Sequence, residues 1–347
     1  MTRSLNRPRP EPSVKATGLR LLHEPPTEAH LDKPSVARIY DYLLGFAHNF
    51  QVDRDATDAA IAVVPGLVHA ARANRAFLRR AVQYALAQGV RQFLDLGAGL
   101  PAVGAVHTIA HEVDPDARVV YVDIDPIVIA HARATVRGLM TVGVLHADIR
   151  DTTFILDHAE VRRLIGFHEP VAILLASVLH FVPDDVTGVV AALCRVMAAG
   201  GYIVISHACN SEDVSMTDAI RELYGKTSTP IHPRSRQQIR GLLAGLDLVS
   251  PDPRSQEPDD LVPVTRWRRD LDELALPTSA SDSSQVAGLL AAVGHAPRLT
   301  TAVAVGHSNQ GAPPQTHDLC VNRTWAPHAS RIRHEANWDR NDDRDTT

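Results

Sequence analysis

The chain has 347 residues, which is more than one small domain needs. Of these residues 45% are hydrophobic, which is enough to build a sizeable hydrophobic core. Its formal net charge is −5, so no broad basic surface is evident and a nucleic-acid partner is not expected. The three cysteines lack paired or metal-type spacing, no apolar signal core is visible, and the longest apolar run is too short to span a bilayer. These features predict a cytoplasmic protein without a membrane partner, and they leave the oligomeric state open.

The first part of the chain is expected to be a tail followed by helices. Residues 1–32 are rich in proline, arginine and glutamate and are predicted to be disordered. Residues 33–90 form a predicted helical segment, in which Ser35 and Asp53 are candidate N-caps of the first two helices. Apolar residues at three- and four-residue steps predict a third helix over residues 67–88.

After residue 90, strand-like and helix-like stretches alternate. Five strands are expected at 92–96, 119–122, 141–145, 171–175 and 202–206, and the last two at 246–249 and 286–293. Strands that alternate with helices of about ten residues imply an α/β fold with a Rossmann-like, doubly wound, mainly parallel seven-stranded sheet. This domain is placed at residues 91–297, and the polar residues 298–347 are predicted to be disordered.

A glycine-rich turn, DLGAGLPA, follows the first predicted strand. It matches the dinucleotide fingerprint G-x-G-x-x-A, but a lone match is weak evidence. The carboxylate of Asp95 would be unfavourable beside a pyrophosphate, and Pro101 lacks the N–H that a phosphate needs. S-adenosylmethionine (SAM) carries a sulfonium and an ammonium, which suit an acid at this position. The turn therefore favours SAM, held at Asp95, Gly97 and Gly99, over a nicotinamide dinucleotide.

Acidic residues also end the second and third predicted strands. Asp123 is placed to accept hydrogen bonds from both ribose hydroxyls of an adenosine, and Ile124 can pack on the adenine face. Asp148 is placed to accept a hydrogen bond from the adenine amino group, with Ile149 packing nearby. Ligands of open α/β sheets bind beyond the carboxyl ends of the strands, so these residues are expected in one site. The alternative is that they are ordinary strand ends and loop acids.

Histidines provide the candidates for catalysis and for metal binding. His180, after the fourth predicted strand, is the candidate catalytic residue, either as a general base or as a group that orients the nucleophile. A structural histidine bonded to backbone is the alternative. His107 and His111 are four residues apart, but Thr108 replaces the glutamate of the zincin motif and no third ligand is identifiable. No metal site is predicted.

With these residues identified, the chain resembles the class I SAM-dependent methyltransferases in DLGAG, YVDID, HADI and MAAGGYIVIS. It is similar, more narrowly, to an actinobacterial S-adenosyl methyltransferase family of unassigned substrate. That likeness covers about residues 33–268 and includes PSVARIYDYLLG, NFQVDRDA and PRSRQQIRGLLAGLDLV. It implies that Asp95, Gly97 and Gly99 hold the methionine end of SAM. It also implies that Asp123 binds the ribose, and that Asp148 and Ile149 bind the adenine.

The resemblance also implies that residues 38–49 form a lid, so that Tyr40 and Asn49 touch the cofactor or shape the acceptor pocket. This chain has Gly45-Phe46 where two glycines are usual, and Ala105 where an asparagine is common. Both differences concern the lid and the acceptor side of the expected site.

The sequence therefore predicts a methyltransferase that moves the SAM methyl group to an oxygen or nitrogen atom of a small molecule by in-line displacement. The sulfonium is already an activated electrophile, so the protein mainly has to align the nucleophile and exclude water. This explains why no strong catalytic constellation is visible. Two alternatives remain open at this point, namely a SAM-binding regulator without turnover and an NAD(P)-dependent oxidoreductase.

Overall fold

The computed structural model describes residues 31–101, 104–183, 186–210, 214–255, 260–271 and 288–297. All of them belong to the first of two units, residues 1–300. The two predicted tails fall almost entirely outside the described residues, as does the start of the last predicted strand at residue 286.

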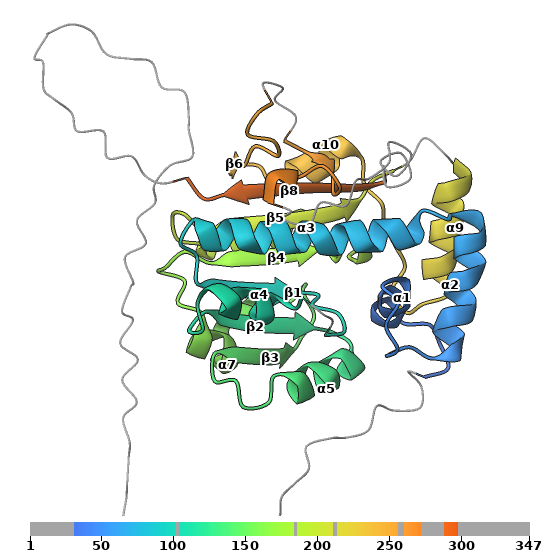
Figure 1. The fold of residues 1–347 in the computed structure, drawn as a ribbon, viewed down its shortest axis with the longest axis horizontal. Coiled ribbons are helices and arrows are strands. Elements are labelled where there is room, and N and C mark those ends of the chain that lie inside the picture. The colour runs from blue at the N-terminus through green and yellow to red at the C-terminus, as the bar shows by residue number, and fades with distance from the viewer. Residues whose placement is uncertain are drawn as a thin grey trace, which may run out of the picture. The chain divides into compact units, whose positions relative to one another are not determined.

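The described part of this unit contains one sheet with eight strands (Figure 1). They are β1 Gln92–Leu96, β2 Arg118–Asp123, β3 Val142–His146, β4 Ala172–Ala176, β5 Tyr202–Ala208, β6 Asp247–Leu248, β7 Val262–Pro263 and β8 Leu289–His295. The order is β3-β2-β1-β4-β5-β8-β6, with β7 also paired to β8. The first five strands are parallel and β8 is antiparallel, which confirms the Rossmann-like, mainly parallel fold. The sequence predicted seven strands, and the one it did not predict is β7, which is too short to give a periodic signal.

Helices cover both faces of the sheet. They are α1 Val36–Leu43, α2 Gln51–Val63, α3 Leu67–Ala87, α4 Val106–Val113, α5 Pro126–Thr135, α6 Thr152–Asp157, α7 Ala159–Leu164, α8 Val186–Val196, α9 Val214–Gly225 and α10 Arg236–Gly241, with short 3₁₀ turns η2 Leu179–Phe181 and η3 Arg269–Leu271. The third helix is confirmed nearly to the residue, whereas α6, α7 and α9 were not predicted. None of the described helices is long and apolar enough to cross a membrane.

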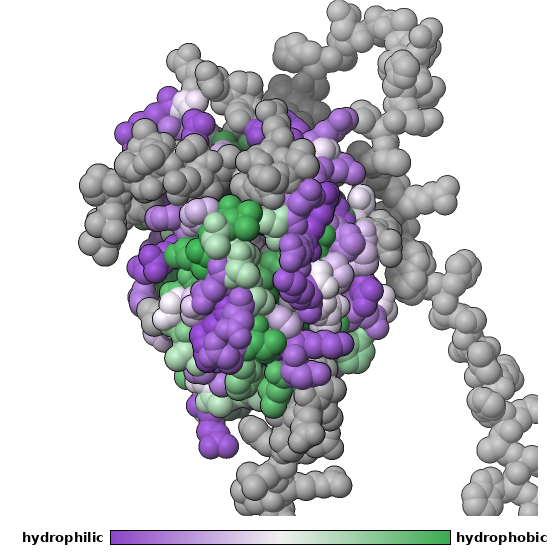
Figure 2. Space-filling model, turned by 90° about the vertical axis from the view of Figure 1, so that its right-hand side faces the viewer, coloured by the Kyte–Doolittle hydropathy of each residue, from purple (hydrophilic) through white to green (hydrophobic). Residues whose placement is uncertain are grey.

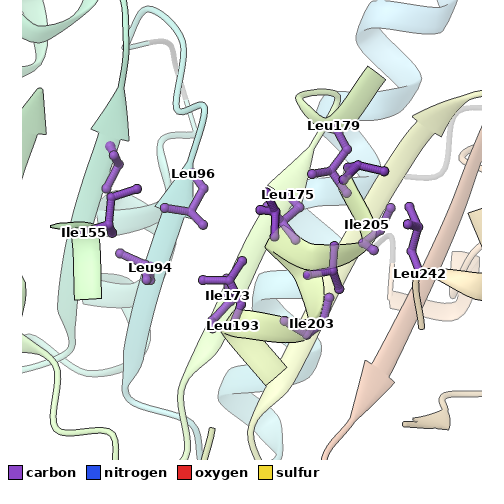
Figure 3. Close-up of a cluster of buried hydrophobic side chains, with 14 of the residues drawn as sticks. Leu94, Leu96, Ile155, Ile173, Leu175, Leu179, Leu193, Ile203, Ile205 and Leu242 are labelled. Atoms are coloured by element: carbon purple, nitrogen blue, oxygen red, sulfur yellow. The ribbon is translucent and has the colours of Figure 1, made fainter. Parts of the chain in front are cut away.

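The core consists of two apolar layers, one on each face of the sheet. Successive strand residues point to opposite faces, so Phe93 packs beneath α3 and α4 while Leu94 and Leu96 pack on the other side. Figure 3 shows this second layer, in which strand residues meet Leu193 of α8 and Leu242. Because both faces are covered, the parallel strands read as continuous apolar runs.

Three helices, α1, α2 and α9, pack together opposite the carboxyl ends of the parallel strands (Figure 1), and we call them the helical cap. Their shared apolar cluster includes Ile39, Leu43, Ala60, Leu223 and Tyr224. On the side of the molecule that carries the cap, hydrophilic and hydrophobic areas are intermixed (Figure 2). The cap therefore has an apolar interior and an outer face of mixed polarity.

A buried ion pair holds the cap together. Nε of Arg38 lies 2.7 Å from Oδ2 of Asp53, and the two side chains are only 1% and 0% exposed. Asp53 also accepts the backbone N–H groups of Ser35 and Phe50. The prediction that Asp53 is an N-cap is wrong by three positions, because α2 starts at Gln51 and the carboxylate reaches back from the first turn.

Ser35 does occupy the N-cap position of α1, but its hydroxyl makes no cap hydrogen bond. Instead the Oγ atom donates to Oδ2 of Asp125 at 2.8 Å. Asp125 is the N-cap of α5, where its other oxygen accepts the N–H of Ile127. The hydroxyl of Ser35 therefore ties the helical cap to the tip of β2.

Replacing Asp53 by alanine is expected to lower the free energy of unfolding by about 3–5 kcal/mol, because it leaves the guanidinium of Arg38 buried without its carboxylate. The matched control is Asp157→Ala, which removes a 2.5 Å pair with Arg162 whose side chains are more than half exposed. That change should cost no more than about 1 kcal/mol. Urea unfolding followed by circular dichroism measures both, and equal losses would contradict the importance of the buried pair.

Candidate active site

A cavity of about 680 Å³ lies between the carboxyl ends of the parallel strands and the helical cap. This volume falls within the range of about 300–1,000 Å³ that is common for small-molecule sites. Nine of the ten residues predicted for the site line it, namely Asp95, Gly97, Gly99, Asp123, Ile124, Asp148, Ile149, Tyr40 and His180.

Asn49 is not among the residues that line the cavity. Its side-chain amide donates to Oδ2 of Asp41 at 2.9 Å and to the carbonyl of Phe46 at 2.7 Å. Its own oxygen accepts a hydrogen bond from Arg54. The polar atoms of Asn49 are therefore engaged inside the cap, where they fix the connection between α1 and α2.

The glycine turn after β1 passes very close to the tip of β4. Gly97 and Gly99 have φ values of 75° and 66°, which disfavour residues with a Cβ atom. A Cβ on Gly97 would lie 2.7 Å from Cβ of Val178 and closer still to its Cγ2, whereas one on Gly99 would meet nothing within 4 Å. Glycine is thus required at position 97 for both backbone conformation and space.

Asp123 joins the glycine turn to the start of α5. One carboxylate oxygen accepts the N–H of Gly99 at 2.9 Å and the other accepts the N–H of Asp125 at 2.9 Å. Burial raises the pKa of this carboxyl, while those backbone N–H groups act in the opposite direction. Each carboxylate oxygen retains capacity for a further hydrogen bond, so the group can still accept ligand hydroxyls.

Asp95 lines the cavity and is only 4% exposed. Burial raises its pKa to about 7, Asp123 adds to the rise, and the guanidinium of Arg75 opposes it. Arg75 comes from α3 and lines the same cavity, and its Nη2 donates to the carbonyl of Gly104. Its buried Nε has no hydrogen-bond partner among the described residues. A carboxyl and a guanidinium with free capacity thus face one ligand space.

The turn after β3 carries a more exposed acid. Asp148 accepts hydrogen bonds from the backbone N–H and the guanidinium of Arg150, which hold its pKa below the usual value. Ile124 lines the cavity although it is 55% exposed, so its side chain forms part of the rim. Ile149 lies on the same wall.

A hydrogen-bonded chain connects the cap to the tips of β4 and β5. Asn74 of α3 donates to the hydroxyl of Tyr40, which in turn donates to the carbonyl of Ala71. The amide oxygen of Asn74 accepts a 2.5 Å hydrogen bond from Ser206, whose Oγ also accepts the N–H of Ser177. Ser177 has φ of 56°, an unusual value for a serine that is held in place by these contacts.

His180 is buried in the cavity wall, 4% exposed, and its Nδ1 accepts the N–H of Ala208 at 3.2 Å. Burial lowers its pKa well below 6.5, and His207 and Arg234 add to that effect. His180 is therefore neutral, and because Nδ1 is an acceptor its proton is on Nε2. In this state the side chain can donate a hydrogen bond through Nε2.

Two cavity residues that sequence reasoning missed, Arg75 and Asn74, lie on α3. A signal was present, because ARANRAF places Asn74 and Arg75 between apolar residues of this helix. Tyr224 of α9 was also missed, because that helix was not predicted. The expectation of no metal site stays a prediction, and among the described residues no group of three or more metal-ligating side chains occurs.

Comparison with known proteins identifies relatives over most of the chain. A family model described as S-adenosyl methyltransferase matches residues 23–296. The structure of a putative methyltransferase from Thermobifida fusca YX is 36% identical, with a TM-score of 0.70, and covers 79% of this chain and 99% of its own. A DUF574 family protein from Streptomyces avermitilis MA-4680 is 30% identical, with a TM-score of 0.68, and covers 77% and 99%. No curated protein has a matching sequence.

The glycine turn offers a test of close packing at the site. Gly97→Ala should lower the free energy of unfolding by more than about 2 kcal/mol, because it adds both a disfavoured φ and an overlap with Val178. Gly99→Ala has the same backbone strain without the overlap and should cost about 1 kcal/mol. Thermal or urea unfolding of the two variants measures the difference, and equal costs would mean that Val178 moves aside freely.

Proposed function

We propose that this chain, which belongs to the S-adenosyl methyltransferase family and is a SAM-dependent methyltransferase, transfers the SAM methyl group to an oxygen or nitrogen atom of a small molecule by in-line displacement. Family membership identifies SAM, and not a dinucleotide, as the cofactor, and it supports the proposal that the glycine turn holds SAM. The observation that carries the proposal is that three strand-end carboxylates, Asp95, Asp123 and Asp148, line one enclosed cavity with that turn.

For the cofactor we propose one contact for each of its chemical groups. Asp123 accepts the ribose hydroxyls, and Asp148 accepts the adenine amino group between Ile124 and Ile149. Asp95 pairs with the ammonium. Arg75 binds the carboxylate of the methionine moiety, an assignment supported by its buried Nε, which has no partner among the described residues. The buried acid and the half-buried guanidinium are then each neutralised by the opposite end of one zwitterion.

The acceptor half of the cavity supports the chemistry through its shape rather than through a strong base. Its walls come from the cap and from the turn after β4, with Leu43, Phe181 and Ile220 among them. Apolar walls exclude water and keep the nucleophile poorly solvated, so that it attacks the methyl carbon opposite the departing sulfur. The protein thus contributes alignment and dehydration.

Of the two roles considered for His180, the geometry supports that of orienting the nucleophile. A general base must accept a proton, but in neutral His180 the nitrogen able to accept, Nδ1, already receives the N–H of Ala208. Nε2–H can instead donate to the acceptor's reactive atom and hold it in line. We therefore propose His180 as a hydrogen-bond donor to the methyl acceptor.

Asp123→Ala is expected to weaken SAM binding at least about tenfold, because hydrogen bonds to a charged group contribute about 1.5–3 kcal/mol. Asp116→Ala is the matched control, since Asp116 is an exposed acid before the opposite end of β2. Isothermal titration calorimetry with SAM measures both variants, and the same titration with NADH should give no tighter binding. Unchanged affinity of the Asp123 variant for SAM would show that the ribose assignment is wrong.

The affinity for SAM should fall about tenfold for each pH unit below 7, because protonation of Asp95 removes the charge that we propose for the ammonium. The pKa of Asp95 is raised, so its negative charge is present above pH 7 and lost as the pH falls. The ammonium gains protons over this range and cannot cause the loss. Calorimetric titrations between about pH 8 and pH 6 test this, and Asp95→Asn should bind weakly with no such slope.

A further inference from the structure

Charge is distributed unevenly in the cavity. Its lining contains four carboxylates among the described residues, Asp95, Asp123, Asp125 and Asp148, and all of them lie at or just after the carboxyl ends of β1, β2 and β3. Among the described residues, no carboxylate lines the half formed by the cap, η2 and residues 228–233. A protonated amine in that half would have no counter-ion from these residues, and placing an unpaired cation among apolar side chains is costly. The acceptor half therefore suits an uncharged molecule.

Aromatic rings build one wall of this half. The rings of Phe181 and Tyr224 lie edge to face with centroids 5.1 Å apart, and Phe181 is also 4.5 Å from the ring of His180. Leu43, Ile220 and other aliphatic residues of the cap complete the surroundings. Aromatic side chains in such arrangements favour a further ring packed against them. The wall thus fits a planar aromatic ligand.

Two polar groups in this wall have unused donor capacity. The hydroxyl of Tyr224 and Nε2 of His180 make no hydrogen bond within the described part of the chain, although both residues line the cavity. Burial raises the pKa of Tyr224 and lowers that of His180, so that the first stays a neutral O–H and the second a neutral N–H. Both flank the ring of Phe181. A ligand on that ring would lie beside two residues with unused donors, and no carboxylate of the described residues lines this half.

We propose that the methyl acceptor is an uncharged aromatic compound with a ring hydroxyl, whose ring packs on Phe181 and whose oxygen receives hydrogen bonds from Tyr224 and His180. This inference rests on the proposed function and specifies the acceptor of the same site. The hydroxyl loses its proton to water as the compound enters the site, and the two donors then stabilise the oxygen anion. The oxygen then forms a bond to the methyl carbon while the carbon–sulfur bond breaks and its electron pair remains on sulfur. The products are an aryl methyl ether and S-adenosylhomocysteine.

Binding and turnover of three probes test the proposal on the full chain in the presence of SAM. They are 2-naphthol, naphthalene without a hydroxyl, and the cationic 2-naphthylmethylamine. We expect 2-naphthol to bind at least about tenfold more tightly than either other probe, and to yield a labelled methyl ether from methyl-labelled SAM. Equal or tighter binding of the ammonium probe, or methylation of its nitrogen in preference to the naphthol oxygen, would overturn the proposal.

Two tyrosine variants make the test specific for the cavity. Tyr224→Phe removes only the proposed donor and should weaken 2-naphthol about tenfold while SAM affinity stays unchanged. Tyr42→Phe, the matched control, removes a hydroxyl that bonds Asp58 outside the cavity and should change neither affinity. If SAM binds the parent protein but 2-naphthol does not, or if Tyr224→Phe leaves naphthol binding intact, the acceptor assignment fails alone. If SAM itself does not bind, the proposed function fails.

Discussion

The site depends on the carboxylate of Asp123, which joins three parts of the molecule. It receives the N–H of Gly99 from the turn after β1 and the N–H of Asp125 at the start of α5. Asp125 in turn accepts the hydroxyl of Ser35, which belongs to the helical cap. Since a buried carboxylate is stable only with such donors, the turn, the helix start and the cap are positioned together. We therefore expect a change at any one of them to alter the cavity.

Burial of charged groups in the cavity creates a need for ligand groups of opposite charge. Asp95 and Arg75 lie in a cavity where apolar side chains dominate, and the pKa of Asp95 is raised to about 7 although a guanidinium is nearby. A bound zwitterion would satisfy both groups at once, whereas a dianionic pyrophosphate would repel Asp95. The polar groups of the cofactor half are thus poorly satisfied by the protein itself, which is consistent with a site organised for a ligand that carries both charges.

Local sequence signals predicted the sheet and the strand-end residues that line one side of the cavity, because strand ends, glycine turns and acidic tips are properties of a few consecutive residues. Distant packing was not predictable in this way. Whether Arg75 and Asn74 face the cavity depends on how α3 lies across the sheet, and Tyr224 depends on a helix that was missed. Asp53 was predicted to be a helix N-cap because aspartate is common at that position. The helix α2 begins two residues before Asp53, however, and the carboxylate forms the buried ion pair with Arg38. Asn49 likewise serves the cap rather than the cavity wall.

The absence of a strong base in the described site agrees with the reaction and does not argue against turnover. A sulfonium methyl group needs no activation, so the barrier depends on alignment and on removing water from the nucleophile. His180 is an example of a residue that aligns the nucleophile without acting as a base. Its Nδ1 is fixed by a backbone N–H of β5 and its pKa is lowered by burial, so the ring presents one N–H in a defined direction. A donor held this rigidly can position an oxygen and stabilise its negative charge without accepting a proton, provided that the acceptor is acidic enough to lose its proton to water. That requirement excludes simple alcohols more strongly than ring hydroxyls, because an aromatic ring lowers the pKa of its hydroxyl to about 10.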